Sequence, residues 1–159
     1  MGATQVLAPV FVQVALSLVL FLWMGRLRFA DVRSGAVRPA DVALGQPNWS
    51  TRTMQVTNAF RNQFELPVLF YLVTVLSLFT ARAGSTLVVL AWTFVGTRLL
   101  HALIHVTTNN FRRRGILFAA GGLVLIAMWI DYFIELYFGS TTTLPPLDLD
   151  ALDLPQTVQ

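Results

Sequence analysis

Two sets of polar side chains recur at helical spacing beside long apolar stretches of this chain. The first set has separations of three or four residues and comprises Gln55, Asn58, Asn62 and Glu65. The second set has separations of 3, 4 and 7 residues and comprises Arg98, His101, His105 and Arg112. Because an α-helix turns by about 100° per residue, each set lies on one face of a helix. Together the two faces predict a polar pocket between two helices.

The residue types in these sets suit an anionic ligand and supply no nucleophile. Arginine pairs bidentately with carboxylates. The chain has no Cys, and all 11 of its basic residues are arginine, so it has neither a thiol nor a lysine for covalent catalysis. A nucleophile then has to arrive with the ligand, and a thiol is the natural candidate. An arginine beside it favours the thiolate, since lowering the pKa by one or two units corresponds to roughly 1.4–2.7 kcal/mol.

Each polar set also has a purely structural interpretation. The first can be the solvated face of a helix that extends beyond the membrane. Glu65 and Arg98 can form an ion pair that only holds two helices together, and His101 and His105 can be hydrogen-bonded packing residues. The two histidines could also share a metal ion or a haem, but no third ligand accompanies them, so no metal is expected.

Long apolar helices are the elements that must position these residues. Apolar residues make up 55 % of the 159-residue chain, charged residues make up 12 %, and the mean hydropathy is +0.65. A soluble domain carries about 25 % charged residues, which argues against a soluble enzyme. Four stretches approach the roughly 20 residues that cross a bilayer, at about 6–24, 61–80, 87–106 and 116–138. Because backbone polar groups must be satisfied inside lipid, we expect an all-α integral membrane four-helix bundle over residues 1–138. An acidic, disordered tail is expected over 139–159.

The arginines set the expected orientation. Six lie between the first apolar stretch and residue 64, three lie between the third and fourth stretches, and only Arg82 lies between the second and third. The positive-inside rule therefore places the arginine-rich loops in the cytoplasm and both termini on the non-cytoplasmic side. This pattern suits a lipid bilayer as partner better than nucleic acid, which we do not expect. Before the second stretch, Ser50 with Pro47 and Asn48 predicts a helix start, and Pro67 predicts a bend just after Glu65.

The run Asn62-Gln63-Phe64-Glu65-Leu66-Pro67, with four spans and a long basic first loop, resembles the MAPEG family. These are the membrane-associated proteins of eicosanoid and glutathione metabolism. The resemblance extends over nearly all of residues 6–138, and its most specific piece is the combination of Asn62, Glu65 and Pro67. It implies a homotrimer with a site between neighbouring subunits near the cytoplasmic face, with glutathione as cosubstrate and a small lipophilic substrate.

The same resemblance assigns roles to individual residues. Asn62 and Glu65 help to hold glutathione, and Arg112 is the catalytic arginine that activates its thiol. An arginine at the end of the first helix, Arg26 or Arg28, also serves the tripeptide.

Other positions of the expected pocket depart from the family. Asn58 stands where family enzymes usually have an arginine, and His101 and His105 stand where the eicosanoid enzymes carry tyrosines. With Arg98 these three residues complete the expected ligand-binding set. Because the all-arginine usage suits a GC-rich genome, we expect a divergent bacterial member in the inner membrane.

Three functions follow from these observations. The first is a membrane-embedded, glutathione- or thiol-dependent transferase or peroxidase that acts on lipophilic electrophiles. The alternative is a non-catalytic trimeric scaffold or lipid-binding protein of the same fold. A haem or metal protein that uses His101 and His105 ranks third.

Overall fold

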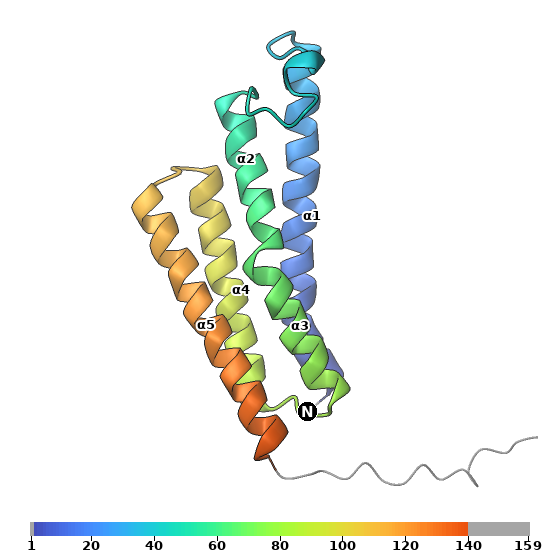
Figure 1. Cartoon of the computed structure of the whole chain (residues 1–159), viewed down its shortest axis with the longest axis vertical. Helices are drawn as coiled ribbons and strands as arrows, with labels where there is room; N and C mark the ends of the chain where they lie inside the picture. The colour runs from blue at the N-terminus through green and yellow to red at the C-terminus, as the bar shows by residue number, and fades with distance from the viewer. Residues whose placement is uncertain (1, 140–159) are drawn as a thin grey trace, which may run out of the picture.

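The structure, a computed structural model, describes residues 2–139 of the chain, and the expected tail lies outside them from residue 140 onward. Within the described residues the chain is helical and contains no strand. Four helical stretches are long and apolar enough to cross a membrane, namely Ala3–Arg33, Thr51–Phe79, Ser85–Val106 and Phe111–Tyr137. The predicted all-α, four-helix architecture is confirmed (Figure 1).

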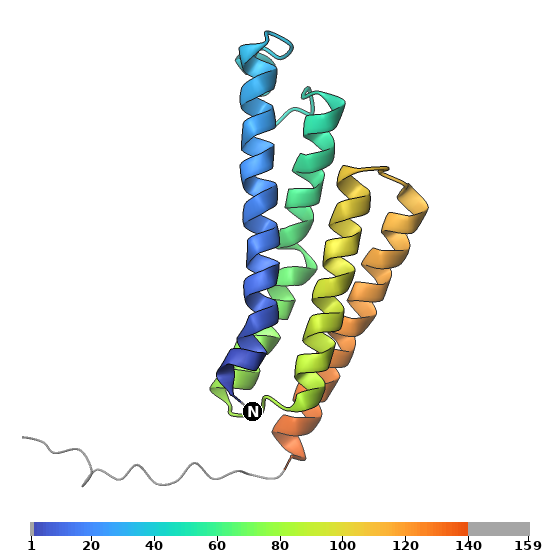
Figure 2. The same cartoon turned by 180° about the vertical axis from the view of Figure 1, so that it is seen from behind.

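The stretches run side by side as a bundle of α1 (Ala3–Arg33), α2 (Thr51–Arg61), α3 (Leu66–Phe79), α4 (Ser85–Val106) and α5 (Phe111–Tyr137). The α1–α2 connection, which holds the short 3₁₀ turn η1 (Pro39–Asp41), lies at the same end of the bundle as the α4–α5 turn. The α3–α4 turn, the start of α1 and the end of α5 lie at the opposite end (Figure 2). Both arginine-rich connections therefore share one end, whereas the side of the membrane that this end faces stays a prediction.

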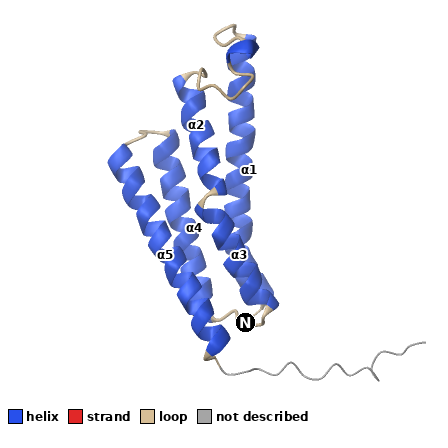
Figure 3. Cartoon of the chain, viewed as in Figure 1, coloured by secondary structure: helices blue, strands red, loops and turns tan. Residues whose placement is uncertain are grey.

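The second span is interrupted where the polar residues are concentrated. Ser50 caps α2 with its hydroxyl oxygen, which accepts a hydrogen bond from the Thr53 N–H. After α2 the chain makes a 3₁₀ turn, η2 (Asn62–Phe64), and Glu65 has a backbone conformation of φ −96°, ψ −103° that is not helical. Pro67 lies in the first turn of α3, where its missing N–H leaves no hydrogen bond unmade. Pro67 was predicted to bend one continuous helix; the structure interrupts the helix at this place instead, and Figure 3 shows a short loop between α2 and α3.

A buried amide pair attaches this break to α1. Gln13, which is fully buried in the middle of α1, donates from Nε2 to Oε1 of Gln63 at 2.7 Å. Gln63 in turn donates to the carbonyl oxygen of Ala59 at 3.0 Å. Because a buried polar group without a partner is costly, these hydrogen bonds fix η2 at one height along α1.

The helix α4 ends earlier than the spacing of the polar residues predicts. Its last residue is Val106, and Asn109 then takes a left-handed conformation with φ 48° before Asn110 caps α5. Arg112 consequently lies in the first turn of α5. The prediction that Arg112 continues the row of Arg98, His101 and His105 on one helix is wrong, because that helix does not extend to residue 112.

Candidate functional site

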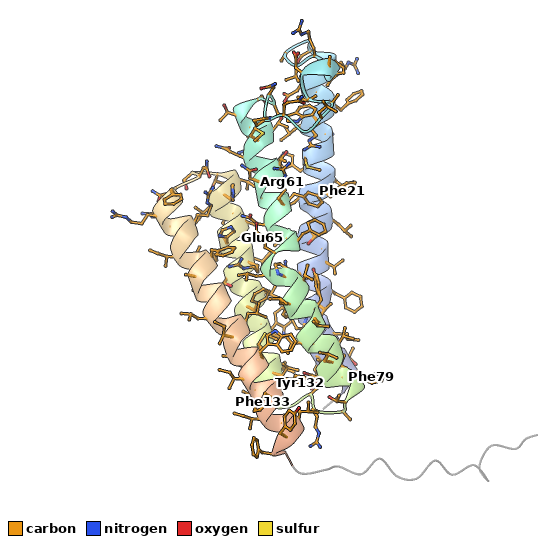
Figure 4. The ribbon with its side chains drawn as sticks, viewed as in Figure 1. Phe21, Arg61, Glu65, Phe79, Tyr132 and Phe133 are labelled. Atoms are coloured by element: carbon orange, nitrogen blue, oxygen red, sulfur yellow. The ribbon has the colours of Figure 1, made fainter. Side chains whose placement is uncertain are left out.

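A polar chamber of about 400 Å³ lies between α2 with η2 on one side and α4 with α5 on the other. Its lining combines two guanidinium groups, two amides, one carboxylate and two imidazoles with aromatic side chains and a glycine. The lining residues are Asn58, Arg61, Asn62, Glu65, His101, His105, Phe111, Arg114, Gly115 and Phe118. Figure 4 shows Arg61 and Glu65 on the α2–η2 side of the chamber.

The chamber brings together five of the nine residues expected at a site. Asn58, Asn62 and Glu65 come from one side, and His101 and His105 come from α4. Four expected residues do not line it, namely Arg26, Arg28, Arg98 and Arg112. The two polar helix faces therefore do meet, but the arginines of the chamber differ from those expected.

His101 joins the two sides of the chamber. Its Nδ1 lies 3.0 Å from the carbonyl oxygen of Arg114, and its Nε2 lies 3.1 Å from Nδ2 of Asn62. A carbonyl only accepts and an amide NH₂ only donates, so Nδ1 carries the proton and Nε2 accepts. The neutral ring of His101 thereby orients Asn62 toward α4.

Arg114 is the arginine that enters the chamber from α5. Its Nη1 donates to Nε2 of His105 at 3.0 Å and to Oδ1 of Asn109 at 2.8 Å. Since a guanidinium only donates, His105 accepts this hydrogen bond as a neutral ring. Two partners thus hold the guanidinium of Arg114 at the chamber wall.

Helical spacing did not identify Arg114 as a chamber residue. The turn at residues 107–110 separates α4 from α5, so positions on α5 do not continue the helical periodicity of α4. The pair Asn109 and Asn110 could have indicated that one helix ends here and another begins, since asparagine favours both left-handed turns and helix N-caps. Arg112 and Arg113, the neighbours of Arg114, are exposed.

Arg98 lies one helical turn from His101, deeper along α4, and is only 1 % exposed. Its Nη2 donates to the carbonyl oxygens of Leu117 and Phe118 on α5, at 2.9 Å and 3.3 Å. Its Nε and Nη1 are buried without a hydrogen-bond partner. The guanidinium lies 5.5 Å from the ring centre of Phe94 and 5.2 Å from that of Phe118, within the range of cation–π attraction.

The expected ion pair between Glu65 and Arg98 is absent, although both residues lie in the described part of the chain. Glu65 is exposed at the break and lines the chamber, whereas Arg98 points toward α5. The prediction was wrong because carbonyl oxygens of α5, and not a carboxylate of the second span, lie within reach of the guanidinium.

Gly121 makes the contact between Arg98 and α5 possible. A Cβ atom at this position would lie 2.4 Å from Nη2 of Arg98 and 2.7 Å from Oγ1 of Thr97. At the neighbouring Gly122 a Cβ would meet only Cδ1 of Leu66, at 3.9 Å. Of the two glycines, only Gly121 therefore lies in close contact with α4.

Metal binding has no support in the residues that the structure describes. Residues 2–139 contain no group of three or more His, Cys, Asp or Glu side chains placed to hold a metal ion. Both ring nitrogens of His101 are already hydrogen-bonded, so ligation by this ring would break one of the contacts that shape the chamber.

A comparison with family models identifies the family of this chain. The model of the MAPEG family matches residues 6–134, which cover all four spans except the first three residues of α1 and the last three of α5. The chain belongs to the MAPEG family. With its four spanning helices, this MAPEG protein is an integral membrane protein. Searches of curated proteins and of solved structures give no match.

Proposed function

We propose that this MAPEG protein is a glutathione- or thiol-dependent transferase or peroxidase that acts on lipophilic electrophiles. The observation that carries the proposal is the chamber, where Arg114 of α5 lies across one cavity from Arg61 and Glu65. Glutathione carries two carboxylates and one ammonium group. Two arginines suit the carboxylates, and one carboxylate suits the ammonium group.

In this proposal Arg114 takes the catalytic role that the resemblance assigns to Arg112. Its guanidinium lies at the chamber wall, so it can stabilise the thiolate of a bound cosubstrate. The thiol proton leaves to water, and the sulfur lone pair then forms a bond to an electrophilic carbon while the leaving group departs. Asn58, Asn62, His101 and His105 complete the set that binds the cosubstrate.

An apolar groove offers a route for the second substrate. It has a volume of about 460 Å³ and lies between α3 and α5, lined by Leu66, Leu69, Ile126, Trp129 and Phe133 among others. Leu66, which lines the groove, follows the chamber residue Glu65 directly in sequence, so the two cavities have neighbouring residues in their walls. A lipophilic electrophile dissolved in the bilayer could reach the thiolate along it.

The homotrimer belongs to the same proposal. Glu65 is exposed in the single chain, and in the family the site lies between subunits. Arg26, Arg28 and Arg112 do not line the chamber of one chain, and in the proposed trimer they are candidates to contact a cosubstrate held by a neighbouring protomer. Chemical cross-linking of the purified protein, analysed by mass, tests whether three chains assemble.

The decisive experiment measures thiolate formation. Glutathione is added to the purified protein, and the ultraviolet absorbance of the thiolate is recorded against pH. We expect Arg114→Ala to lose the signal and the exposed neighbour Arg113→Ala to keep it. Arg112→Ala shows whether Arg112 also contributes to the thiolate signal. Absence of a thiolate signal in the unaltered protein, or equal signals in the Arg114 and Arg113 variants, contradicts the proposal.

A non-catalytic scaffold or lipid-binding protein is the second candidate. It is favoured by the hydrogen bonds that already engage the rings of His101 and His105 with protein groups. It predicts that Arg114→Ala alters stability or lipid retention while no conjugation is measurable in any variant. A steady conjugation rate with chlorodinitrobenzene that Arg114→Ala abolishes excludes it.

We also propose that the protein lies in a bacterial inner membrane with its arginine-rich end in the cytoplasm. The absence of cysteine permits a direct test with single introduced cysteines. A membrane-impermeant maleimide should label Gly84→Cys, in the α3–α4 turn, in intact cells. It should label Gly35→Cys, after α1, only in opened membranes, and the reverse pattern refutes the orientation.

A further inference from the structure

A second polar pocket lies beneath the connection between α1 and α2. Its volume is about 180 Å³, less than half that of the chamber. Arg28 of α1 and Arg61 of α2 contribute to its lining, together with Thr57, Gln46 and Trp49. Arg61 also lines the chamber, so the two cavities share one residue.

Most of the hydrogen-bonding capacity of the Arg28 guanidinium is unused. Its Nε is buried and makes no hydrogen bond. Its Nη2 makes only a long contact of 3.5 Å with Oγ1 of Thr57, and its guanidinium lies 5.0 Å from the centre of the Trp49 ring. These contacts hold the side chain in place without neutralising its charge.

Among the other residues that line this pocket, Gln46 can donate a hydrogen bond and none carries a carboxylate. Oε1 of Gln46 accepts a hydrogen bond from the Leu44 N–H, which leaves the amide NH₂ of Gln46 available to donate. Two nearby acids of the same region have partners elsewhere. Asp31 accepts from the hydroxyl of Thr53 at 2.7 Å, and Asp41 pairs with Arg38 at 2.8 Å, and neither lines the pocket. The pocket is therefore lined by two arginines and by no acidic residue.

We infer that this pocket, formed by Arg28, Arg61, Thr57 and Gln46, binds a phosphate group. Planar guanidinium groups from two helices, together with neutral donors, suit the several oxygens of one phosphate. Arg28 lies one turn beyond Met24, where the apolar part of α1 ends, which is the level expected for lipid headgroups. The phosphate belongs either to a phospholipid headgroup or to a free anion. The pocket is too small to serve as a second copy of the chamber, and this inference does not depend on the proposed function.

The first test measures stability in neutral detergent. Thermal unfolding is followed with inorganic phosphate and with chloride at equal ionic strength. Saturating phosphate should raise the Tm by about 2–4 °C. Arg28→Gln should lose this shift, whereas the matched control Arg26→Gln, an exposed arginine on the same helix that does not line the pocket, should keep it. Gln46→Ala, a loop change that leaves both arginines in place, should reduce the shift if Arg28→Gln fails to fold.

The second test distinguishes the two sources of phosphate. In phosphate-free buffer the protein is reconstituted into bilayers of phosphatidylglycerol or of a glucosyl diacylglycerol, which carries no phosphate. A lipid ligand stabilises the unaltered protein only in phosphatidylglycerol, and Arg28→Gln removes that difference. A free phosphate ligand gives the shift only in the first test. If Arg28→Gln and Arg26→Gln behave alike in both tests, the inference is wrong.

Discussion

Replacing Gly121 by alanine is the sharpest test of how Arg98 is held inside the bundle. The new Cβ would lie 2.4 Å from Nη2 of Arg98, whereas ordinary contact begins near 3.4 Å. The guanidinium would have to retreat by about 1 Å, which breaks its 2.9 Å hydrogen bond to the carbonyl oxygen of Leu117. At 1 % exposure no water replaces that partner.

The expected loss can be worked from two opposing effects. A hydrogen bond from a charged donor is worth about 1.5–3 kcal/mol. Alanine is a better helix former than glycine by up to about 1 kcal/mol. We therefore expect Gly121→Ala to lower the free energy of unfolding by about 1–2 kcal/mol.

The measurement is reversible unfolding in mixed micelles followed by tryptophan fluorescence. Gly122→Ala is the matched control, because its Cβ would meet only Cδ1 of Leu66 at 3.9 Å. This variant should be as stable as the unaltered protein or slightly more so. In an Arg98→Ala background the penalty of Gly121→Ala should shrink, because only the contact of the new Cβ with Oγ1 of Thr97, at 2.7 Å, remains. Equal effects at the two glycines, or an undiminished penalty in that background, would refute the reasoning.

Three further contacts give predictions for the same unfolding assay. Gln13→Leu should lower the free energy of unfolding by about 1–3 kcal/mol, because it leaves the buried amide oxygen of Gln63 without its hydrogen-bond donor. The double variant Gln13→Leu with Gln63→Leu should recover part of this loss. A double variant no more stable than Gln13→Leu would contradict the role of the pair. Ser50→Ala should cost about 1 kcal/mol through the lost N-cap of α2, and an unchanged stability would show that the cap is dispensable. Arg52 donates a hydrogen bond to the carbonyl oxygen of Val106, the last residue of α4. Arg52→Leu should therefore destabilise the protein more than Arg52→Lys, which keeps the positive charge. Equal losses of stability in the two variants would show that a cation at this position is irrelevant.

The sequence alone was sufficient for those features that depend on neighbouring residues. Apolar length predicts the four spans, and local chemistry predicts the cap at Ser50 and a change of helix direction near Pro67. Spacing also predicts that Asn62 and His101 belong to faces that meet, and the structure places them 3.1 Å apart. The spans, the cap and the interruption are predicted correctly because they need only the geometry of one helix at a time.

The failures have two causes, which are a helix end that periodicity does not reveal and the placement of one helix against another. Arg112 was assigned to the wrong helix because periodicity does not reveal where α4 ends. An ion pair between Glu65 and Arg98 was predicted because their charges are opposite. The direction in which a side chain leaves its helix does not determine which atoms of the neighbouring helices lie within hydrogen-bond distance of it. The amide of Gln13 was overlooked, although a single glutamine within an apolar span is itself a signal of a buried contact.

The anchoring of Arg98 on α5 also bears on how the chain enters a membrane. An arginine at the centre of a segment makes its insertion by the translocon less favourable by about 2.5–3.5 kcal/mol. The carbonyl oxygens that receive this side chain, at Leu117 and Phe118, are synthesised only after α4 itself. The fold therefore favours entry of α4 and α5 together as a helical hairpin, with the charge already sheltered before the pair meets lipid.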